Sequence, residues 1–360
     1  MANDLMTDFG LDGLLAFSRS NVFYLTGDWL FDGFYTFNPH LALLLKKEKP
    51  ILIAPPEEED FIQSQQIRVA EIRYYDRPPG MDATENVSST LRSLGLSNNK
   101  TIGFDGKGTP AFLLEGIRNR TSARLRDASA VFEELRKIKT ESEVSKIRES
   151  TRINDKAFRA AYDSVKEGTT EIEFATCYRM SVVSSGADVT FVEIGADPRG
   201  KMVYPTTYRM RAGGMLHLDA GASYQHYQSD TSRVAVLKTA SEKVTRIESA
   251  LREGELKAIE ALRPGVSVSE IFKTCVRNVQ KKYPPYQGWY FGHGMGIDTH
   301  EPPLIVEGVS ETLKRNMVVN IEVGYYCEGL GLLNVEDTLL ITEDSHEYLS
   351  GLDQEIYVLA

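Results

Sequence analysis

The sequence lacks the long apolar runs and paired cysteines that mark membrane and secreted proteins. It has no stretch of the about 18 consecutive apolar residues that a membrane span needs, and residues 1–8 do not combine a basic region with an apolar one. Cys177, Cys275 and Cys327 are too few and too far apart for a disulfide framework or a cysteine metal site. We therefore expect a cytoplasmic protein with no membrane partner.

Basic clusters are also missing. The net charge is −10, and no long block of lysine and arginine offers a stripe for phosphates, so a nucleic acid is not expected as a partner. With 42% hydrophobic and 26% charged residues, the composition is that of an ordinary globular protein. The 360 residues exceed what one hydrophobic core usually organises, which predicts two domains.

The first part of the chain, residues 1–135, alternates short β-type runs with helical stretches, which predicts a small α/β domain. The expected strands are 13–17, 41–45 and 51–54, and the expected helices are 57–66 and 84–95. We place the domain boundary between residues 135 and 136.

The second part, residues 136–360, shows two helical patterns followed by β-type segments, and then the same order again. Thr140 can cap a long helix that runs to residue 166, because glutamates follow in its first turn. The other expected helices are 168–185, 241–263 and 268–282, and the expected strands are 214–219, 229–237, 317–326 and 332–342. The fold class is α/β (α+β), and the repeated order suits a pseudo-symmetric sheet with a site on its concave face.

A set of carboxylates and histidines falls in these β-type segments or their turns. They are Asp219, Asp230, His293, His300, Glu322 and Glu336. Four carboxylates and one imidazole can hold two divalent cations for hydrolytic chemistry, because shared carboxylates offset the repulsion between the ions. Glycines at 292, 294 and 296 around His293 indicate a close approach of the backbone in a functional turn.

Read in order, this set resembles the pita-bread metallopeptidase superfamily, in its branch of prolidase, aminopeptidase P and creatinase. Residues 10–27 look like the N-terminal domain of that branch, and residues 136–143 look like its domain junction, so the resemblance covers nearly the full chain. It implies a creatinase-like N-terminal domain at 1–135, a pita-bread catalytic domain at 136–360, and a homodimer.

The resemblance also implies the roles of the site residues. Asp219 would chelate one metal ion, Asp230 and Glu336 would bridge both ions, and His293 with Glu322 would complete the other. Glu322 would then take a proton from the attacking water, and His300 would hydrogen-bond the substrate carbonyl. We expect two divalent ions, Mn²⁺ first, with Co²⁺, Zn²⁺ or Fe²⁺ as alternatives, since the ligand set leaves the metal open.

Further residues are candidates for substrate binding or for support of the ligands. His217 lies two residues before Asp219 and so shares its face if both lie in one strand; the alternative is a half-buried histidine bonded to backbone. Glu301 has either a catalytic or supporting role or is a surface charge beside Pro302. Arg233 is expected to support the metal loop.

Four positions depart from the family pattern, and one of them is Val323, which follows Glu322 in place of the common proline. Trp289 and Tyr204 stand where substrate-side histidines are expected, and Asn334 stands where an arginine commonly precedes the last metal glutamate. Asparagine cannot give a substrate carboxylate the charge-assisted hydrogen bonds of arginine. The metal ligands are therefore kept while the residues that recognise the substrate are altered.

Three functions compete on this basis. The first is a dinuclear metal-dependent hydrolase that cleaves an amide bond in an Xaa-Pro dipeptide or peptide N-terminus. The second keeps the metal site but acts on a non-peptide small molecule, by hydrolysis of a modified amino acid or lysis of a sulfonium compound. The third is an inactive pita-bread binding module, which the retention of all five ligands disfavours.

Overall fold

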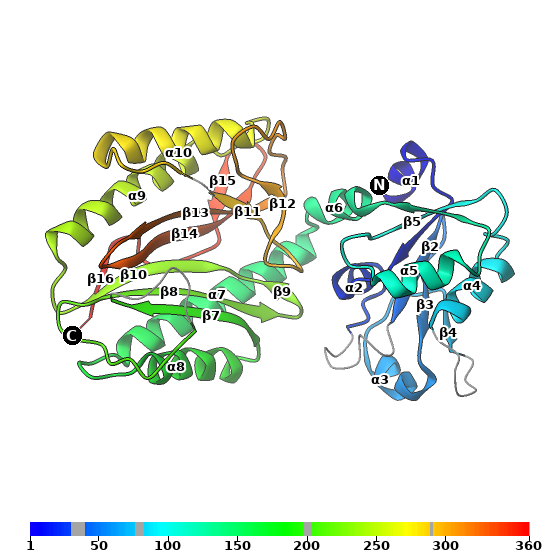
Figure 1. Ribbon diagram of the computed structural model, residues 1–360, viewed down its shortest axis with the longest axis horizontal. Coiled ribbons are helices and arrows are strands. Elements are labelled where there is room, and N and C mark those ends of the chain that lie inside the picture. Colours follow the sequence, from blue (N-terminus) through cyan, green and yellow to red (C-terminus); the bar gives the residue numbers. More distant parts are fainter. Residues whose placement is uncertain (30–39, 76–82, 198–203, 289–290, 360) are drawn as a thin grey trace. The chain divides into compact units, whose positions relative to one another are not determined.

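The computed structural model describes residues 1–29, 40–75, 83–197, 204–288 and 291–359. The chain divides into two compact units, Met1–Arg136 and Lys137–Ala360 (Figure 1). Among the helices in these described ranges, none combines the length and the apolar character needed to cross a bilayer.

The first unit is built on a six-stranded sheet in the order β4-β3-β2-β1-β5-β6. Its strands are β1 (Gly13–Ala16), β2 (Leu41–Leu45), β3 (Ile51–Ala54), β4 (Glu71–Tyr74), β5 (Thr101–Phe104) and β6 (Arg124–Asp127). Its helices are α1 (Ala2–Asp8), α2 (Arg19–Thr26), η1 (Pro56–Glu58), α3 (Glu59–Ser64), α4 (Ala83–Ser93), α5 (Ala111–Arg118) and α6 (Ser129–Lys137), the last of which leads into the second unit. Neighbouring residues of β1 point to opposite faces, so Leu15 belongs to one core and Leu14 to another.

The second unit is built on a ten-stranded sheet whose main path is β12-β11-β13-β14-β10-β8-β7. Its strands are β7 (Asp188–Ala196), β8 (Met215–Tyr224), β9 (Tyr227–Gln228), β10 (Thr231–Leu237), β11 (Gly292–Gly294), β12 (Glu301–Leu304), β13 (Val318–Cys327), β14 (Gly331–Ile341), β15 (His346–Tyr348) and β16 (Tyr357–Leu359). The series β7-β8-β10 and β11-β13-β14 meet where β10 pairs with β14. The sheet thus has two similar halves, as the repeated order of helices and strands predicted.

Each half of this sheet carries one pair of helices. They are α7 (Glu141–Asp163) and α8 (Glu171–Ser184), then α9 (Glu242–Glu260) and α10 (Val268–Lys282). Figure 1 shows the first pair beside β7 and β8 and the second beside β13 and β14. Thr140 caps α7, as predicted, and it does so within a capping box in which the side chain of Glu143 bonds back to the backbone of Thr140.

Alternation along the strands separates a face covered by helices from the opposite face, which we call the site face. On β13, Val319, Ile321 and Val323 belong to the core that α9 and α10 cover. The residues between them therefore point to the site face, and Glu322 is one of these. The same rule places Asp219 and Glu336 on the site face, because their neighbours Leu218 and Val335 are core residues.

The stability of this unit depends on pH through the carboxyl group of Asp155 on α7. Its carboxylate is 5% exposed and accepts a hydrogen bond of 2.6 Å from the backbone N–H of Gly351. Burial raises its pKa from 3.8 to about 6. Because the folded state holds this proton more tightly than the unfolded state does, the contribution of Asp155 to stability is present at low pH and is lost as the pH rises through about 6.

We expect Asp155→Asn to raise the melting temperature at pH 8 and to change it little near pH 4.5. Asparagine keeps an acceptor for Gly351 and removes the buried charge, a gain of about 1–2 kcal/mol at pH 8. Thermal unfolding at the two pH values measures this, with Asp163→Asn, at an exposed position on the same helix, as the matched control. A larger gain at pH 4.5 than at pH 8 would contradict the prediction.

Candidate metal centre

A row of polar side chains crosses the site face. In the strand register, Glu193 of β7 lies opposite Asp219 of β8, and Asp219 lies opposite Ser232 of β10. Ser232 also lies opposite Glu336 of β14, which lies opposite Glu322 of β13. Residues directly opposite each other in antiparallel strands have neighbouring side chains on one face. The sheet therefore brings four carboxylates into one row, although the chain carries them far apart.

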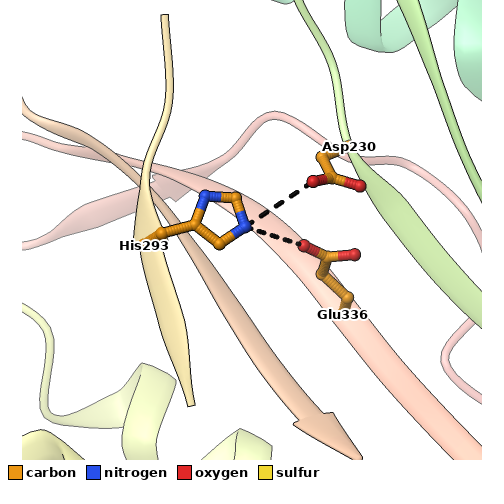
Figure 2. A group of neighbouring side chains, drawn as sticks. All are labelled: Asp230, His293 and Glu336. Carbon is orange, nitrogen blue, oxygen red and sulfur yellow. Dashed lines mark ion pairs between the residues drawn. The ribbon is translucent and has the colours of Figure 1, made fainter. Parts of the chain in front are cut away.

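Asp230 and His293 join this row beside Glu336 (Figure 2). The Nε2 atom of His293 lies 3.6 Å from Oδ2 of Asp230 and 3.6 Å from Oε1 of Glu336. One potential ligand atom from each of the three residues lies within 4.8 Å of the others, and all three side chains are buried. This is the geometry of a group that can share one cation.

The glycines beside His293 allow strand β11 to approach its neighbours closely. A Cβ atom at Gly292 would lie 2.1 Å from the carbonyl oxygen of Asn320, and Gly292 has φ of 147°. A Cβ atom at Gly294 would lie 2.3 Å from the carbonyl oxygen of Pro302. The Nδ1 atom of His293 lies 3.0 Å from the carbonyl oxygen of Gly294. Donation from Nδ1 to this oxygen leaves Nε2 as the atom that faces the carboxylates.

His300 stacks on His293, with ring centroids 4.0 Å apart and an interplanar angle of 25°. Its side chain is exposed to solvent, unlike that of His293. Partial desolvation and the neighbouring His293 lower the pKa of His300. A neutral imidazole that reaches solvent next to the carboxylates can form a hydrogen bond with a substrate group there.

The carboxylates of the row interact strongly. Burial and the charge of Glu336 raise the pKa values of Asp219 and Asp230 well above 3.8. The same causes, in the same order, raise the pKa of Glu322 to about 7. Like charges in a buried site disfavour ionisation unless a cation compensates them.

The donor set fits divalent cations. Among the residues that the structure describes, Oδ1 of Asp219, Oδ1 of Asp230 and Oε2 of Glu336 are buried and have no hydrogen-bond partner. Buried polar atoms without partners are rare in folded proteins, and an ion is one of the explanations for them. Carboxylate oxygens and one imidazole nitrogen suit hard or borderline divalent ions such as Mn²⁺, Co²⁺, Fe²⁺ and Zn²⁺.

Three uncharged side chains on the site face hold the ligands in place. The Nδ2 group of Asn334 donates to Oε1 of Glu322 at 2.8 Å and to Oδ2 of Asp219 at 3.4 Å. The Nδ2 group of Asn320 donates to Oε1 of Glu336 at 2.7 Å, and the hydroxyl of Thr338 donates to the carbonyl of Asp230 at 3.0 Å. Asn320 and Thr338 were not predicted, although each lies two residues from a metal candidate and so on the same face.

Behind Glu336, on the face covered by helices, lies a buried ionic network. Arg233 donates to the backbone carbonyl of Glu336 and to Oδ1 of Asp337, at 2.5 Å in each case. Arg252 of α9 pairs with Glu255 and with Oδ2 of Asp337, the latter at 3.3 Å. Burial alone would raise the pKa of Asp337, but Arg233 and Arg252 lower it. Arg233 thus supports the strand that carries Glu336, while its support of the metal loop stays a prediction.

His217 has a well-defined hydrogen-bond partner. The Nε2 atom of His217 lies 2.8 Å from the hydroxyl of Ser232, and burial lowers the pKa of this histidine to about 4. The alternative of a half-buried histidine bonded to backbone was wrong, because His217 is 2% exposed and its partner is a side chain.

Glu301 is 4% exposed, so the alternative of a surface charge was also wrong. Its Oε1 atom accepts hydrogen bonds from the backbone N–H groups of Ile297 and Asp298, at 3.0 and 3.1 Å. Its Oε2 atom pairs with Nζ of Lys139 at 3.1 Å. Glu301 therefore fixes the turn between His293 and His300.

Tyr204 and Trp289 were predicted as substrate-side residues. Tyr204 is 86% exposed. Trp289 lies outside the described residues. Their roles in substrate binding stay predictions.

Comparisons with known proteins agree with this architecture. Residues 145–343 match the model of metallopeptidase family M24, and residues 2–138 match that of the creatinase/prolidase N-terminal domain. The chain is 31% identical to an Xaa-Pro dipeptidase of Pyrococcus furiosus over 72% of this chain and 76% of that one. It is 28% identical to an Xaa-Pro dipeptidase of Pyrococcus horikoshii over 98% of this chain and 96% of that one. The solved prolidase from Pyrococcus furiosus superimposes with a TM-score of 0.85 at 25% identity, over 98% of this chain and 99% of that one.

Proposed function

Because the chain belongs to metallopeptidase family M24 and is a metal-dependent hydrolase, we propose that it cleaves the amide bond of Xaa-Pro dipeptides with two divalent ions, Mn²⁺ first. The observation that carries the proposal is the arrangement of Asp230, His293 and Glu336 within 4.8 Å of one another. The two Pyrococcus relatives named Xaa-Pro dipeptidase support the choice of substrate.

Five residues on the site face would hold the two ions. Asp219 and Glu322 flank the central group and share the Nδ2 group of Asn334. We assign Asp219, Asp230, His293, Glu322 and Glu336 as the residues that would hold the two ions. Bound divalent cations would lower the pKa of a water molecule and polarise the substrate carbonyl.

Glu322 is the residue that accepts the proton of the attacking water. It lies opposite Glu336 in the strand register, so a carboxylate that can accept a proton stands beside the central group. His300 donates a hydrogen bond to the substrate carbonyl from its exposed position over His293.

A non-peptide substrate is the second candidate, and Asn334 favours it. The Nδ2 group of Asn334 is used by Glu322 and Asp219, so this side chain offers no positive charge to the carboxylate of a dipeptide. A small modified amino acid or a sulfonium compound would not need that charge. The inactive binding module is the third candidate, and the five retained ligands weigh against it.

The proposal extends to the domains, the oligomeric state, the compartment and the substrate class. We place a creatinase-like domain at residues 1–135 and the pita-bread catalytic domain at 136–360, and we expect a homodimer in the cytoplasm. The substrate is a short peptide or another small molecule.

Asp230→Ala tests the proposal directly. Wild type loaded with Mn²⁺, Co²⁺ or Zn²⁺ should carry about two ions per chain and cleave a panel of Xaa-Pro dipeptides, and the substitution should lower kcat/KM by at least about 10³-fold with loss of metal. Metal analysis and dipeptide hydrolysis measure both effects. Asp188→Ala, at an exposed position of β7, is the control. Two ions without peptide turnover would redirect the search to non-peptide substrates, and no bound ion would support the binding module.

A further inference from the structure

Glu193 is a carboxylate of the row that the metal ligands do not include. It lies on β7 directly opposite Asp219. Its neighbours Val192 and Ile194 belong to the core covered by helices, so Glu193 points to the site face. The strand that carries it was not predicted from the sequence, and neither was the residue.

The residues that the structure describes around the Glu193 carboxylate do not satisfy both of its oxygens. It is partly exposed, and its Oε2 atom is buried without a hydrogen-bond partner among the described residues. Its neighbour across the sheet, Asp219, is 9% exposed and also has a buried oxygen, Oδ1, without a partner. The metal site accounts for Oδ1 of Asp219, so Oε2 of Glu193 is the acceptor left for another cation beside it.

An aromatic ring lies next to this carboxylate. Phe191 is two residues before Glu193 on the same strand and so on the same face. Its ring packs over Gly221, where a Cβ atom would lie 2.8 Å from a ring carbon. A ring beside a carboxylate suits an organic cation, because the ring face attracts positive charge and covers a methylene chain.

The position along the row separates Glu193 from the central ligands. Three strand spacings lie between Glu193 on β7 and Glu336 on β14, about 14 Å between their main chains. A peptide whose scissile carbonyl lies beside Glu336 has its α-ammonium close to that carbonyl. A lysine side chain instead carries its ammonium about 6 Å from the α-carbon, far enough to approach Glu193.

We propose that Glu193 is a specificity-determining residue that binds the cationic side chain of a lysine or arginine at the N-terminal position of the substrate, with Phe191 covering the methylene chain. This inference rests on the proposed amide hydrolysis at the neighbouring metal centre. It assigns Glu193 to the substrate and not to a metal ion.

Paired dipeptides test it on the manganese-loaded enzyme. Lysyl-proline and norleucyl-proline have side chains of similar length, and only the first is charged. Wild type is expected to prefer lysyl-proline at least about tenfold in kcat/KM, a difference that a single charge-assisted hydrogen bond can give. Glu193→Gln should remove most of that preference and leave norleucyl-proline within about twofold, while Asp188→Asn, on the same strand, should change neither. Equal use of both dipeptides by wild type, or an unchanged preference in Glu193→Gln, would overturn the inference.

Binding of free amino acids tests the role of Glu193 independently of the proposed hydrolysis. Calorimetry on the manganese-loaded protein should show L-lysine binding at least about tenfold more tightly than L-norleucine, and Glu193→Gln should abolish the difference. If neither dipeptide is cleaved but this difference is found, the proposed reaction fails and the role of Glu193 stands. If lysine has no advantage, or if Glu193→Gln loses manganese, Glu193 does not bind a substrate cation.

Discussion

Glu322→Gln is expected to lower kcat by at least about 10³-fold and to leave about one divalent ion per chain. The substitution removes the group that accepts the proton and one ligand from the end of the row. The central group of Asp230, His293 and Glu336 does not contain Glu322, so it can still hold an ion. Glutamine keeps the size of the side chain and an acceptor for the Nδ2 group of Asn334.

Metal analysis and steady-state kinetics on the same preparations measure the two effects together. Glu328→Gln is the matched control, since Glu328 is exposed just after the same strand and outside the row. Full metal content with an unchanged kcat would refute the assignment of Glu322 as ligand and base. Loss of both ions would show instead that Glu322 helps to hold the central group.

Removal of the metal ions with a chelator is expected to lower the melting temperature by about 10 °C at pH 8, and by much less at pH 5. At a free ion concentration of about 1,000 times the dissociation constant, binding contributes about 4 kcal/mol. A change of this size moves the melting temperature of a domain of 150–250 residues by about 10 °C.

The pH dependence follows from the raised pKa values of the row. Burial and Glu336 raise the pKa values of Asp219 and Asp230, and they raise that of Glu322 to about 7. The folded metal-free protein therefore binds more protons than the unfolded chain, and its stability falls as the pH rises from about 4 through about 7. Bound cations compensate the charges and remove this dependence.

Thermal unfolding with and without chelator at pH 5 and pH 8 measures the effect. Asp230→Ala is the informative variant, because it should respond little to the chelator and should be more stable than metal-free wild type at pH 8. A metal-free protein that is more stable at pH 8 than at pH 5 would contradict this account.

The metal candidates could be read from the sequence because each has a local signal. His293 stands between glycines, and Glu322 and Glu336 each stand in an apolar run of strand character. The strands β8, β13 and β14, which carry Asp219, Glu322 and Glu336, and β10, which follows Asp230, were predicted within a few residues, except that β8 continues to Tyr224. Strand β11, which carries His293, was not predicted. The capping of α7 by Thr140 was also predicted correctly, since a cap depends on residues close in sequence.

Contacts between strands could not be predicted from the sequence, because the residues that form them lie far apart along the chain. Glu193 is one glutamate in a nine-residue strand with a bulge, and only its register with Asp219 places it beside the metal candidates. Asn334 was predicted to bind the substrate or to support the ligands, and only the strand register shows that its amide is shared by Glu322 and Asp219. In the first unit, β4, β5 and β6 and the short helices α1, α2 and α5 were not predicted, because short elements have weak local patterns and depend on tertiary packing.

The row across the sheet has a consequence for the synthesis of the protein. Along the chain, the first residue of the row is Glu193 on β7 and the last is Glu336 on β14. Strand β14 is also the strand that joins the two halves of the sheet. A nascent chain that has not yet released β14 from the ribosome presents its remaining ligands without Glu336, on an unfinished sheet edge. The ability to take up metal is therefore acquired only near the end of translation, and a chain cut before β14 would expose half a sheet that is prone to aggregate.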